Sequence, residues 1–451
     1  MTLAQRLARL VASVGPAAVE PAPAALGTAE ALGTAEALGT AAALGTAAAL
    51  GTAALGTAAA APGVDGLRRQ LQALLERTEP LHPRPAPESS LRRRAAWERL
   101  PFVSRETPSG PFWQRLERLT GGHRVGSIAL ERLAAADPRV LAELALDPSI
   151  AGTAPSSWLF LDTETTGLGG AGTLAFLVGM GALDADGGVV LEQLVLRDPG
   201  QERALLERVA ARFESASLIV TFNGKAFDRP LLEGRYVMNR LPPLPVRPHL
   251  DLLHVARRLH RERLGSCNLK RLEREVLGFE RGPDLDGSEV AAVYGHFLRS
   301  SDTSGMAAVV AHNLWDVASM LALVGLYGQR LPPLAGVDLA GLARTLHRAG
   351  AAQEAERTAQ AACESGGGVD ALRVRALLAK ARGDAASATR DLELVCAEVD
   401  DPAGRLELAK LYEHQLRSPA RALEWLGQGT TESEDAHARR RARLARKLGL
   451  C

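Results

Sequence analysis

Residues 158–164 read WLFLDTE, a short apolar run that ends in acidic side chains. A run of this length and composition predicts a buried strand. Two more apolar runs follow, AFLVGMGAL at 175–183 and VVLEQLVLRD at 189–198, and the turn sequence DADGG joins them. We expect these two runs to be further strands connected as a hairpin.

Helical and strand patterns then alternate along the chain. Helical spacing is present at 202–215 and 228–240, the run SLIVTFNG at 217–224 predicts another strand, and PHLDLLHVARRL leads from a strand into a helix. The stretch from 266 to 328 reads as mostly helical. Three consecutive strands followed by alternating elements predict an α/β fold, a mixed sheet with helices on its faces.

We divide the chain into four parts. Residues 1–63 contain the unit LGTA repeated at six-residue spacing, which fits neither a helix nor a heptad, so we expect a low-complexity linker. Residues 64–155 read as a basic N-terminal extension with one helix near 128–146. Residues 156–330 are the α/β domain, and 334–451 are an all-helical domain. In the extension, Phe112 and Trp113 could contact nucleic acid or dock on the main domain, and we favour docking.

The helical domain shows a repeat. Small-residue segments recur so that Ala355, Ala388 and Ala422 stand 33 and 34 residues apart, which is the length of a tetratricopeptide repeat. We expect a tetratricopeptide-like region that could bind a protein partner or could only stabilise the main domain.

Composition excludes several classes. The formal net charge of +1 argues against a histone-like nucleic-acid binder. Four widely separated cysteines without a CxxC pair argue against a disulfide framework or a structural zinc site, and fit a cytoplasmic protein. We predict no membrane-spanning segment and no membrane partner.

The acidic residues carry the chemistry. Asp162 and Glu164 lie two apart on a predicted strand and so point to one face, where two carboxylates repel each other unless a cation lies between them. Oxygen ligands of this kind suit Mg²⁺ or Mn²⁺. Asp228 opens a predicted helix after FNGKAFD. His312 and Asp316 lie one helical turn apart in HNLWD, so His312 could act as a general base on a water beside the metal.

The segments DTETTGL, NGKAFDRP and HNLWD together resemble the three motifs of the DEDD (DnaQ-like) exonucleases, which have a ribonuclease-H-like fold. The longer segments TETTGLGGAGTLAFLVG, FNGKAFDRPLLEGRY, HLDLLHVARRL and SCNLKRLEREVLGFER resemble the YprB-type exonuclease family more narrowly. The resemblance covers about residues 100–328. It implies a metal-dependent 3′–5′ exonuclease that hydrolyses phosphodiester bonds, with a single-stranded 3′ end of nucleic acid as substrate.

The resemblance also implies roles for single residues. Asp162, Glu164 and Asp316 would hold a first ion, and Asp162 with Asp228 a second, so that the two ions contact the attacking and leaving oxygens. His312 would orient and deprotonate the attacking water. Residues near Thr165 and Leu168 would pack on the terminal sugar and base of the substrate. Asn223 and Lys225 would hold its phosphate backbone.

Three points depart from that pattern or stay open. His312 precedes Asp316 by four positions, the spacing of the tyrosine subclass, whereas the histidine subclass has five; His312 could instead be a core histidine. Asp251 could orient a ligand or cap the following helix, and we favour the cap. A basic stretch could track phosphates or form a solvated helix face, and consists of Arg257, Arg258, Arg261, Arg263, Lys270 and Arg271.

The sequence leaves two other functions open. The domain could be catalytically silent and bind nucleic acid while the helical region recruits partners, or it could be a structure-selective endonuclease. An inactive domain usually loses one of its acids, because clustered carboxylates are costly without a metal. All four acids are present, which favours the exonuclease.

Overall fold

The computed structural model of the 451-residue chain describes residues 98–167, 172–282, 284–330 and 332–450. The repeat tract, with all of 1–63, and Leu168 lie outside these residues, so the predictions for them are not addressed by the structure.

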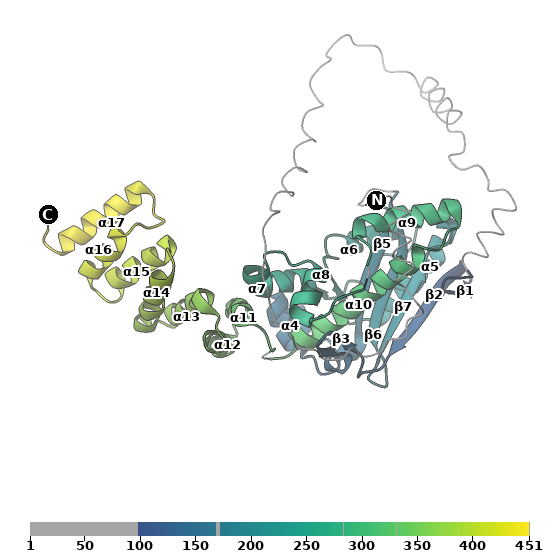
Figure 1. Cartoon of the computed structure of the whole chain (residues 1–451), viewed down its shortest axis with the longest axis horizontal. Helices are drawn as coiled ribbons and strands as arrows, with labels where there is room; N and C mark the ends of the chain where they lie inside the picture. The colour runs from purple at the N-terminus through teal and green to yellow at the C-terminus, as the bar shows by residue number, and fades with distance from the viewer. Residues whose placement is uncertain (1–97, 168–171, 283, 331, 451) are drawn as a thin grey trace, which may run out of the picture. The chain divides into compact units, whose positions relative to one another are not determined.

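A seven-stranded mixed sheet forms the centre of the α/β domain (Figure 1). Its order is β1-β2-β7-β6-β5-β8-β9, antiparallel from β1 to β5 and parallel from β5 to β9. The strands are β1 (Val103–Thr107), β2 (Gly110–Leu119), β5 (Trp158–Thr165), β6 (Ala175–Leu183), β7 (Val189–Val195), β8 (Leu218–Thr221) and β9 (His249–Asp251). A separate pair is formed by β3 (Arg124–Val125) and β4 (Ile128–Ala129). The predicted α/β class, a mixed sheet flanked by helices and followed by helices alone, is confirmed.

The N-terminal extension is part of this sheet, which the sequence did not predict. β2 pairs antiparallel with β7 along residues 113–119. Phe112 is buried in the core, and the guanidinium of Arg197 lies 4.9 Å from the ring centre of Trp113, in agreement with the docking interpretation. The strand was not predicted because charged side chains lie on both of its faces, Arg115 and Glu117 on one and Arg118 on the other, so that PFWQRLERL shows no regular apolar alternation.

The helix expected near 128–146 is shorter than predicted. The pair β3–β4 and the short helix η1 (Leu130–Leu133) occupy the first part, and α4 (Pro138–Ala145) begins only after Asp137. The Asp137 side chain accepts from the backbone N–H of Arg139, and Pro138 stands at the first helical position. Both residues favour a helix start at this point.

Helices cover both faces of the sheet. On β5, Trp158 and Phe160 join a core with α4, α7 and α10, whereas Leu159 and Leu161 join a second core with α5, α6 and α9. This alternation is the two-residue period of a strand buried on both faces. The remaining elements of this domain are η2 (Pro148–Gly152), η3 (Pro155–Ser157), η4 (Pro199–Gln201), α5 (Glu202–Ser215), α6 (Asp228–Met238), α7 (Leu252–Leu264), α8 (Leu269–Leu272), the π-helical turn η5 (Glu273–Leu277), α9 (Gly287–Ser300) and α10 (Met306–Tyr327).

Helix α10 packs unusually close to the sheet. A Cβ atom at Gly179 of β6 would lie 2.3 Å from Oδ1 of Asn313, and one at Gly181 would lie 2.7 Å from Val317. Glycine at these two positions therefore lets α10 approach the centre of the sheet. By length and composition α10 is apolar enough to cross a membrane, but 78% of its most apolar window is buried inside the protein. It is a core helix of this domain.

The C-terminal part consists of helices, each packed on the next along the chain. They are α11 (Gly336–Arg348), α12 (Ala352–Glu364), α13 (Gly368–Ala381), α14 (Ala385–Glu398), α15 (Pro402–His414), α16 (Pro419–Gly427) and α17 (Glu434–Lys447). The three alanines of the predicted repeat, Ala355, Ala388 and Ala422, are each fully buried. The helical character is confirmed, and the assignment to the tetratricopeptide class stays a prediction.

The first of these helices, α11, packs on α7 of the α/β domain. A Cβ at Gly341 would lie 2.6 Å from the backbone oxygen of Leu259, so the two helices are in close contact. Asp338 is fully buried at this junction. One of its carboxylate oxygens accepts from the Nη2 atom of Arg263 at 2.6 Å and lies 3.0 Å from Nδ1 of His260.

Candidate active site

The end of β5 carries two of the predicted acids on one face of the sheet. Asp162 and Glu164 follow the same alternation as Trp158 and Phe160, whose side chains lie in the core with α10. The register with β6 shifts between Glu164 and Thr165. Such an irregularity bends a strand and redirects its side chains. Both acids therefore lie at the end of a central strand and face α10.

Helix α10 supplies the opposing groups. Nε2 of His312 lies 3.5 Å from Oδ2 of Asp316, as expected for side chains one turn apart. One donor atom from each of Glu164, His312 and Asp316 falls within 4.8 Å of the other two. Two carboxylate oxygens and an imidazole nitrogen at this spacing can hold a divalent ion such as Mn²⁺. His312 therefore belongs to the cluster, and is not a remote core histidine.

Asp228 approaches from the other face of the sheet. It is the first residue of α6, as predicted, where the helix dipole favours a carboxylate. The Thr163 hydroxyl, which points away from its neighbours on β5, donates to Oδ1 of Asp228 at 2.5 Å. Asp228 is only 7% exposed and lines the same cavity as Asp162.

The electrostatics of this cluster favour a bound cation. Burial, reinforced by Asp316 and Glu164, raises the pKa of Asp162 well above its usual value. Burial also raises the pKa of Glu164 to about 7, against the opposing effect of His312, and that of Asp228 to about 6, against the hydrogen bond from Thr163. Three neighbouring carboxyl groups that resist ionisation are a poor arrangement for a protein without a counter-ion. The donor set therefore fits a divalent cation.

Two buried side-chain amides that were not predicted from the sequence hold Asp162 in place. Nδ2 of Asn313 donates to Oδ2 of Asp162 at 2.8 Å. Nε2 of Gln193, on β7, donates to Oδ1 of Asn313 at 3.0 Å and to the backbone oxygen of Val310 at 2.8 Å. The only signal in the sequence was that Asn313 follows His312 within HNLWD.

His312 has a partner that was also missed. Its Nδ1 lies 2.8 Å from Oδ1 of Asp284, which precedes α9. Burial lowers the pKa of the imidazole, but the hydrogen bond to Asp284 and the charges of Asp316 and Glu164 outweigh it, so the net pKa is raised. Within RGPDLDG, Asp284 reads as a turn residue, and nothing in the sequence connects it with a histidine 28 positions later.

Arg281 is another residue that the sequence did not reveal. Its side chain is 6% exposed, and its Nη2 donates to both Asp316 and Glu273. Nε of the same guanidinium donates to the second oxygen of Glu273 at 2.8 Å. Glu273 also accepts from the hydroxyl of Ser319 on α10. Arg281 thus links the acid of α10 to the π-helical turn.

Asp251 is a helix cap, the role favoured for it, and it also holds the turn before α6. It caps α7 by accepting from the backbone N–H of Leu253 at 3.1 Å. It also accepts from the backbone N–H groups of Asn223 at 2.8 Å and Lys225 at 3.1 Å. Asn223 has a φ of 67°, in the left-handed region that asparagine tolerates. Asp251 therefore fixes the turn that leads into Asp228.

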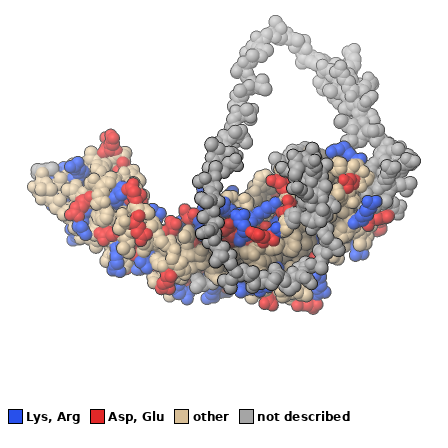
Figure 2. All heavy atoms as spheres, viewed as in Figure 1, with Lys and Arg blue, Asp and Glu red and all other residues tan. Residues whose placement is uncertain are grey.

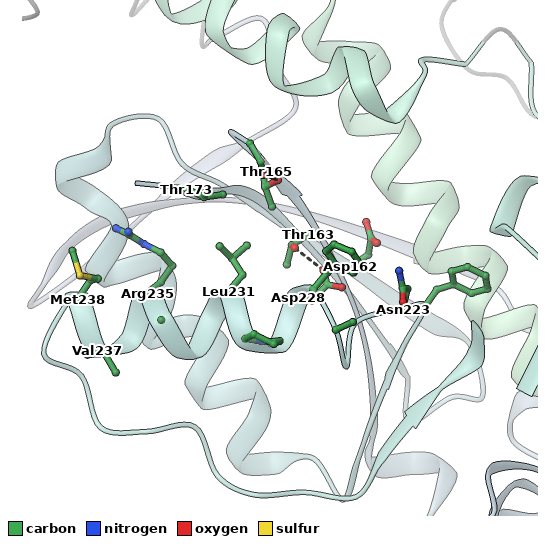
Figure 3. A pocket seen from close by; sticks show the side chains of 16 residues that line it. Asp162, Thr163, Thr165, Thr173, Asn223, Asp228, Leu231, Arg235, Val237 and Met238 are labelled. Atoms are coloured by element: carbon green, nitrogen blue, oxygen red, sulfur yellow. Dashed lines mark hydrogen bonds between the residues drawn. The ribbon is translucent and has the colours of Figure 1, made fainter. Parts of the chain in front are cut away.

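A cavity of about 790 Å³ extends from the acids along α6. Figure 3 shows Asp162 and Asp228 at one end and Val237 and Met238 further along the helix. Of the predicted substrate-binding residues, Thr165 and Asn223 line this cavity. Lys225 is exposed on the turn before α6 and does not line it, and Leu168 is outside the described residues.

The predicted basic stretch is divided among several contacts. Arg258 donates to the backbone oxygen of Leu144, Arg263 pairs with Asp338, and Lys270 pairs with Asp284. Figure 2 shows acidic and basic side chains intermixed over the described residues of the face in view. Neither a phosphate-tracking groove nor a solvated helix face describes the whole stretch, because these three side chains make contacts within the folded protein.

Part of the chain is similar to known proteins. Residues 159–327 match the model of the RNase_H superfamily. A protein of Bacillus subtilis (strain 168), named uncharacterized protein YprB, is 41% identical over 167 residues, which are 36% of this chain and 40% of that protein. The chain thus matches less than half the length of this curated relative. Residues 159–327, which contain all four predicted acids and His312, form an RNase H-like domain.

Proposed function

We propose that this chain is a metal-dependent 3′–5′ exonuclease that hydrolyses phosphodiester bonds of nucleic acid. One observation carries the proposal: four carboxylates and a histidine, two at the end of β5, one at the start of α6 and two on α10, lie together beside a cavity that Asp162 and Asp228 line. RNase H-like domains are usually nucleases, which supports the reaction class. The 3′ polarity rests on the resemblance of the three motifs to DEDD exonucleases.

The acids would hold two ions, Mg²⁺ or Mn²⁺. Asp162, Glu164 and Asp316 are the proposed ligands of the first, and Asp162 with Asp228 of the second. When bound, such ions neutralise the charge that develops on the attacking and leaving oxygens of the phosphodiester. Glu164, Asp316 and His312 already have donor atoms within 4.8 Å of one another.

His312 would handle the proton. Its Nδ1 is engaged by Asp284, so Nε2, on the side of Asp316, is the atom that would accept a proton from the attacking water. The leaving group would be the 3′ oxygen of the penultimate nucleotide. Loss of a general base typically slows a reaction by about 10²–10⁴-fold.

The cavity along α6 would receive the end of the strand. Phe227, Val237 and Met238 near it are more than half exposed, which is unusual for large apolar side chains. Bases stack on such surfaces without sequence preference. Thr165 and Leu168 are the proposed contacts of the terminal sugar and base, Asn223 and Lys225 those of the phosphates.

The second candidate is a catalytically silent protein that binds nucleic acid and recruits a protein partner through α11–α17. The cluster of acids argues for the enzyme. Their raised pKa values show that the folded chain bears a cost for holding them together without a cation. A domain that only binds nucleic acid would gain nothing from four clustered carboxylates that lower its stability.

The decisive experiment incubates the full chain with single-stranded DNA or RNA carrying a 3′ or a 5′ label, with Mn²⁺, Mg²⁺ or a chelator. We expect mononucleotides to be released from the 3′ label and a shrinking ladder from the 5′ label, only with metal. Asp162→Asn should abolish cleavage. Asp186→Asn, an exposed acid of the β6–β7 hairpin, is the matched control.

Three results would contradict the proposal. Cleavage by Asp162→Asn at the parental rate would show that the acids take no part in the reaction. No cleavage by folded, metal-bound parent protein would favour the catalytically silent binding protein. Internal cuts without loss of the 3′ label would indicate an endonuclease.

A further inference from the structure

Asp284 and His312 form a buried pair beside the acids. Oδ1 of Asp284 lies 2.8 Å from Nδ1 of His312, and the two side chains are only 15% and 8% exposed. The other ring nitrogen of His312 lies 3.5 Å from Asp316. Nη1 of Arg281 is also near Nδ1, at 3.5 Å, and donates to the backbone oxygen of His312 at 3.4 Å. Asp284 is thus the nearest partner of Nδ1, and the ring lies between two carboxylates that contact different nitrogens.

Asp284 is itself held in place from three directions. Its Oδ2 lies 3.0 Å from Nζ of Lys270 and 3.3 Å from Nη1 of Arg281. Its Oδ1 also accepts from the backbone N–H of Leu285 at 2.9 Å, and Nζ of Lys270 donates to the backbone oxygen of Leu285 at 2.8 Å. Although burial raises the pKa of Asp284, the His312, Lys270 and Arg281 contacts outweigh it and lower that pKa, so the group is an ionised acceptor.

An ionised carboxylate at Nδ1 decides which ring nitrogen carries the proton. It can only accept, so in the neutral imidazole Nδ1 keeps its hydrogen and Nε2 keeps its lone pair. Nε2 is the nitrogen that faces Asp316. The nitrogen of His312 that can accept a proton, Nε2, is therefore on the side of Asp316.

We propose that Asp284 is a positioning residue, which fixes the orientation and tautomer of His312 so that the lone pair of Nε2 points at the acid cluster. The inference rests on the proposed function for its consequence in catalysis, but the pairing itself can be measured without any substrate. Asp284 does not belong to the set of donor atoms near Glu164, so it acts through His312.

The substrate-free measurement uses the full chain labelled with ¹⁵N-histidine. Two-bond ¹H–¹⁵N spectra at pH 9 report which nitrogen of each neutral ring is protonated, and His312→Ala identifies the signal. We expect Nδ1–H for His312 in the parent and a mixture of tautomers in Asp284→Asn. Asp286→Asn is the matched control. Asp286 lies two residues after Asp284 in the chain, but it caps α9 and contacts Ser288.

The kinetic measurement is a double-mutant cycle. Asp284→Asn should lower kcat by about 10–100-fold, the usual effect of removing an outer partner of a site, with KM within about threefold. In a His312→Ala background the same change should alter kcat by less than about twofold, because residues that act as a unit are not additive. Mn²⁺ affinity, measured from the paramagnetic resonance of free Mn²⁺, should stay within about threefold of the parent. If Asp284→Asn does not fold, Asp284→Ser removes the same charge.

The outcomes separate this inference from the proposed function. An unchanged His312 tautomer in Asp284→Asn, or an equal loss of kcat with and without His312, would overturn the positioning role. A shifted tautomer in a chain that cleaves no nucleic acid would uphold the pairing and contradict the exonuclease alone.

Discussion

Asn313 on α10 donates from Nδ2 to Oδ2 of Asp162 on β5 at 2.8 Å, and no side chain larger than hydrogen fits at Gly179 beside it. We expect Asn313→Ala to reduce nuclease activity by about 10–100-fold, because Asp162 loses the bond that orients it. The change also leaves Gln193 with one fewer partner in the core, which should cost about 1–3 kcal/mol of unfolding free energy. Kinetics with Mn²⁺ and urea unfolding measure the two effects. Parental activity would show that Asp162 needs no orientation.

Glu164 should destabilise the metal-free protein at high pH. Its pKa is about 7 when folded, against an ordinary value of 4.5 for glutamate, so between these values the folded chain retains a proton that the unfolded chain has released. Stability therefore falls as pH rises through this range. We expect Glu164→Gln to raise the unfolding free energy at pH 8 in chelator by up to about 3 kcal/mol, with little effect near pH 4.

Thermal unfolding across pH tests this prediction, with Glu233→Gln on the exposed side of α6 as control. Adding Mn²⁺ should reverse the order at pH 8, because the ion stabilises the parent more than the variant. A Glu164→Gln variant that is less stable than the parent in chelator at pH 8 would contradict the electrostatic account.

Arg281 should stabilise the folded protein through its pairing with a buried carboxylate. It neutralises Glu273, which is 1% exposed, so Arg281→Met leaves a buried carboxylate with only the Ser319 hydroxyl. Breaking one side of a buried pair costs about 3–5 kcal/mol. Urea unfolding should show this loss, whereas Arg274→Met, which removes an exposed pair with Glu275, should change stability by less than about 1 kcal/mol.

The same network gives a rescue experiment. Adding Glu273→Gln to Arg281→Met should recover part of the stability, because Glu273, the most deeply buried of the three carboxylates that Arg281 contacts, then carries no charge. Failure of the double variant to recover any stability would mean that the loss does not come from the charge of Glu273.

Asp338 should hold α11 on the α/β domain. Its carboxylate is fully buried and pairs with Arg263, beside His260. We expect Asp338→Asn to lower the unfolding free energy by about 3 kcal/mol. Asp370→Asn, which removes a partly exposed pair with Arg373 on α13, should cost less than about 1 kcal/mol. Equal effects of the two variants in urea unfolding would show that the junction does not depend on this pair.

The regular elements followed from local patterns. The strand at 175–183 and the helix at 202–215 occupy the residues that their apolar spacing indicated, because both bury one periodic set of side chains. β2 was missed because its charged residues obscured the strand period. The start of α4 was misplaced because the prediction followed the apolar spacing, whereas Asp137 and Pro138 determine where the helix begins.

The sequence by itself determined which chemical groups this protein brings to its site, since Asp162, Glu164, Asp228, His312 and Asp316 stand at strand ends and helix turns that local physics predicts. Only the tertiary structure decided what holds them. Asn313, Arg281 and Asp284 act across 151, 35 and 28 residues of chain, on Asp162, Asp316 and His312 respectively. A hydrogen bond over such separations leaves no period in the sequence, because it depends on how helices pack on the sheet and not on the spacing within either one.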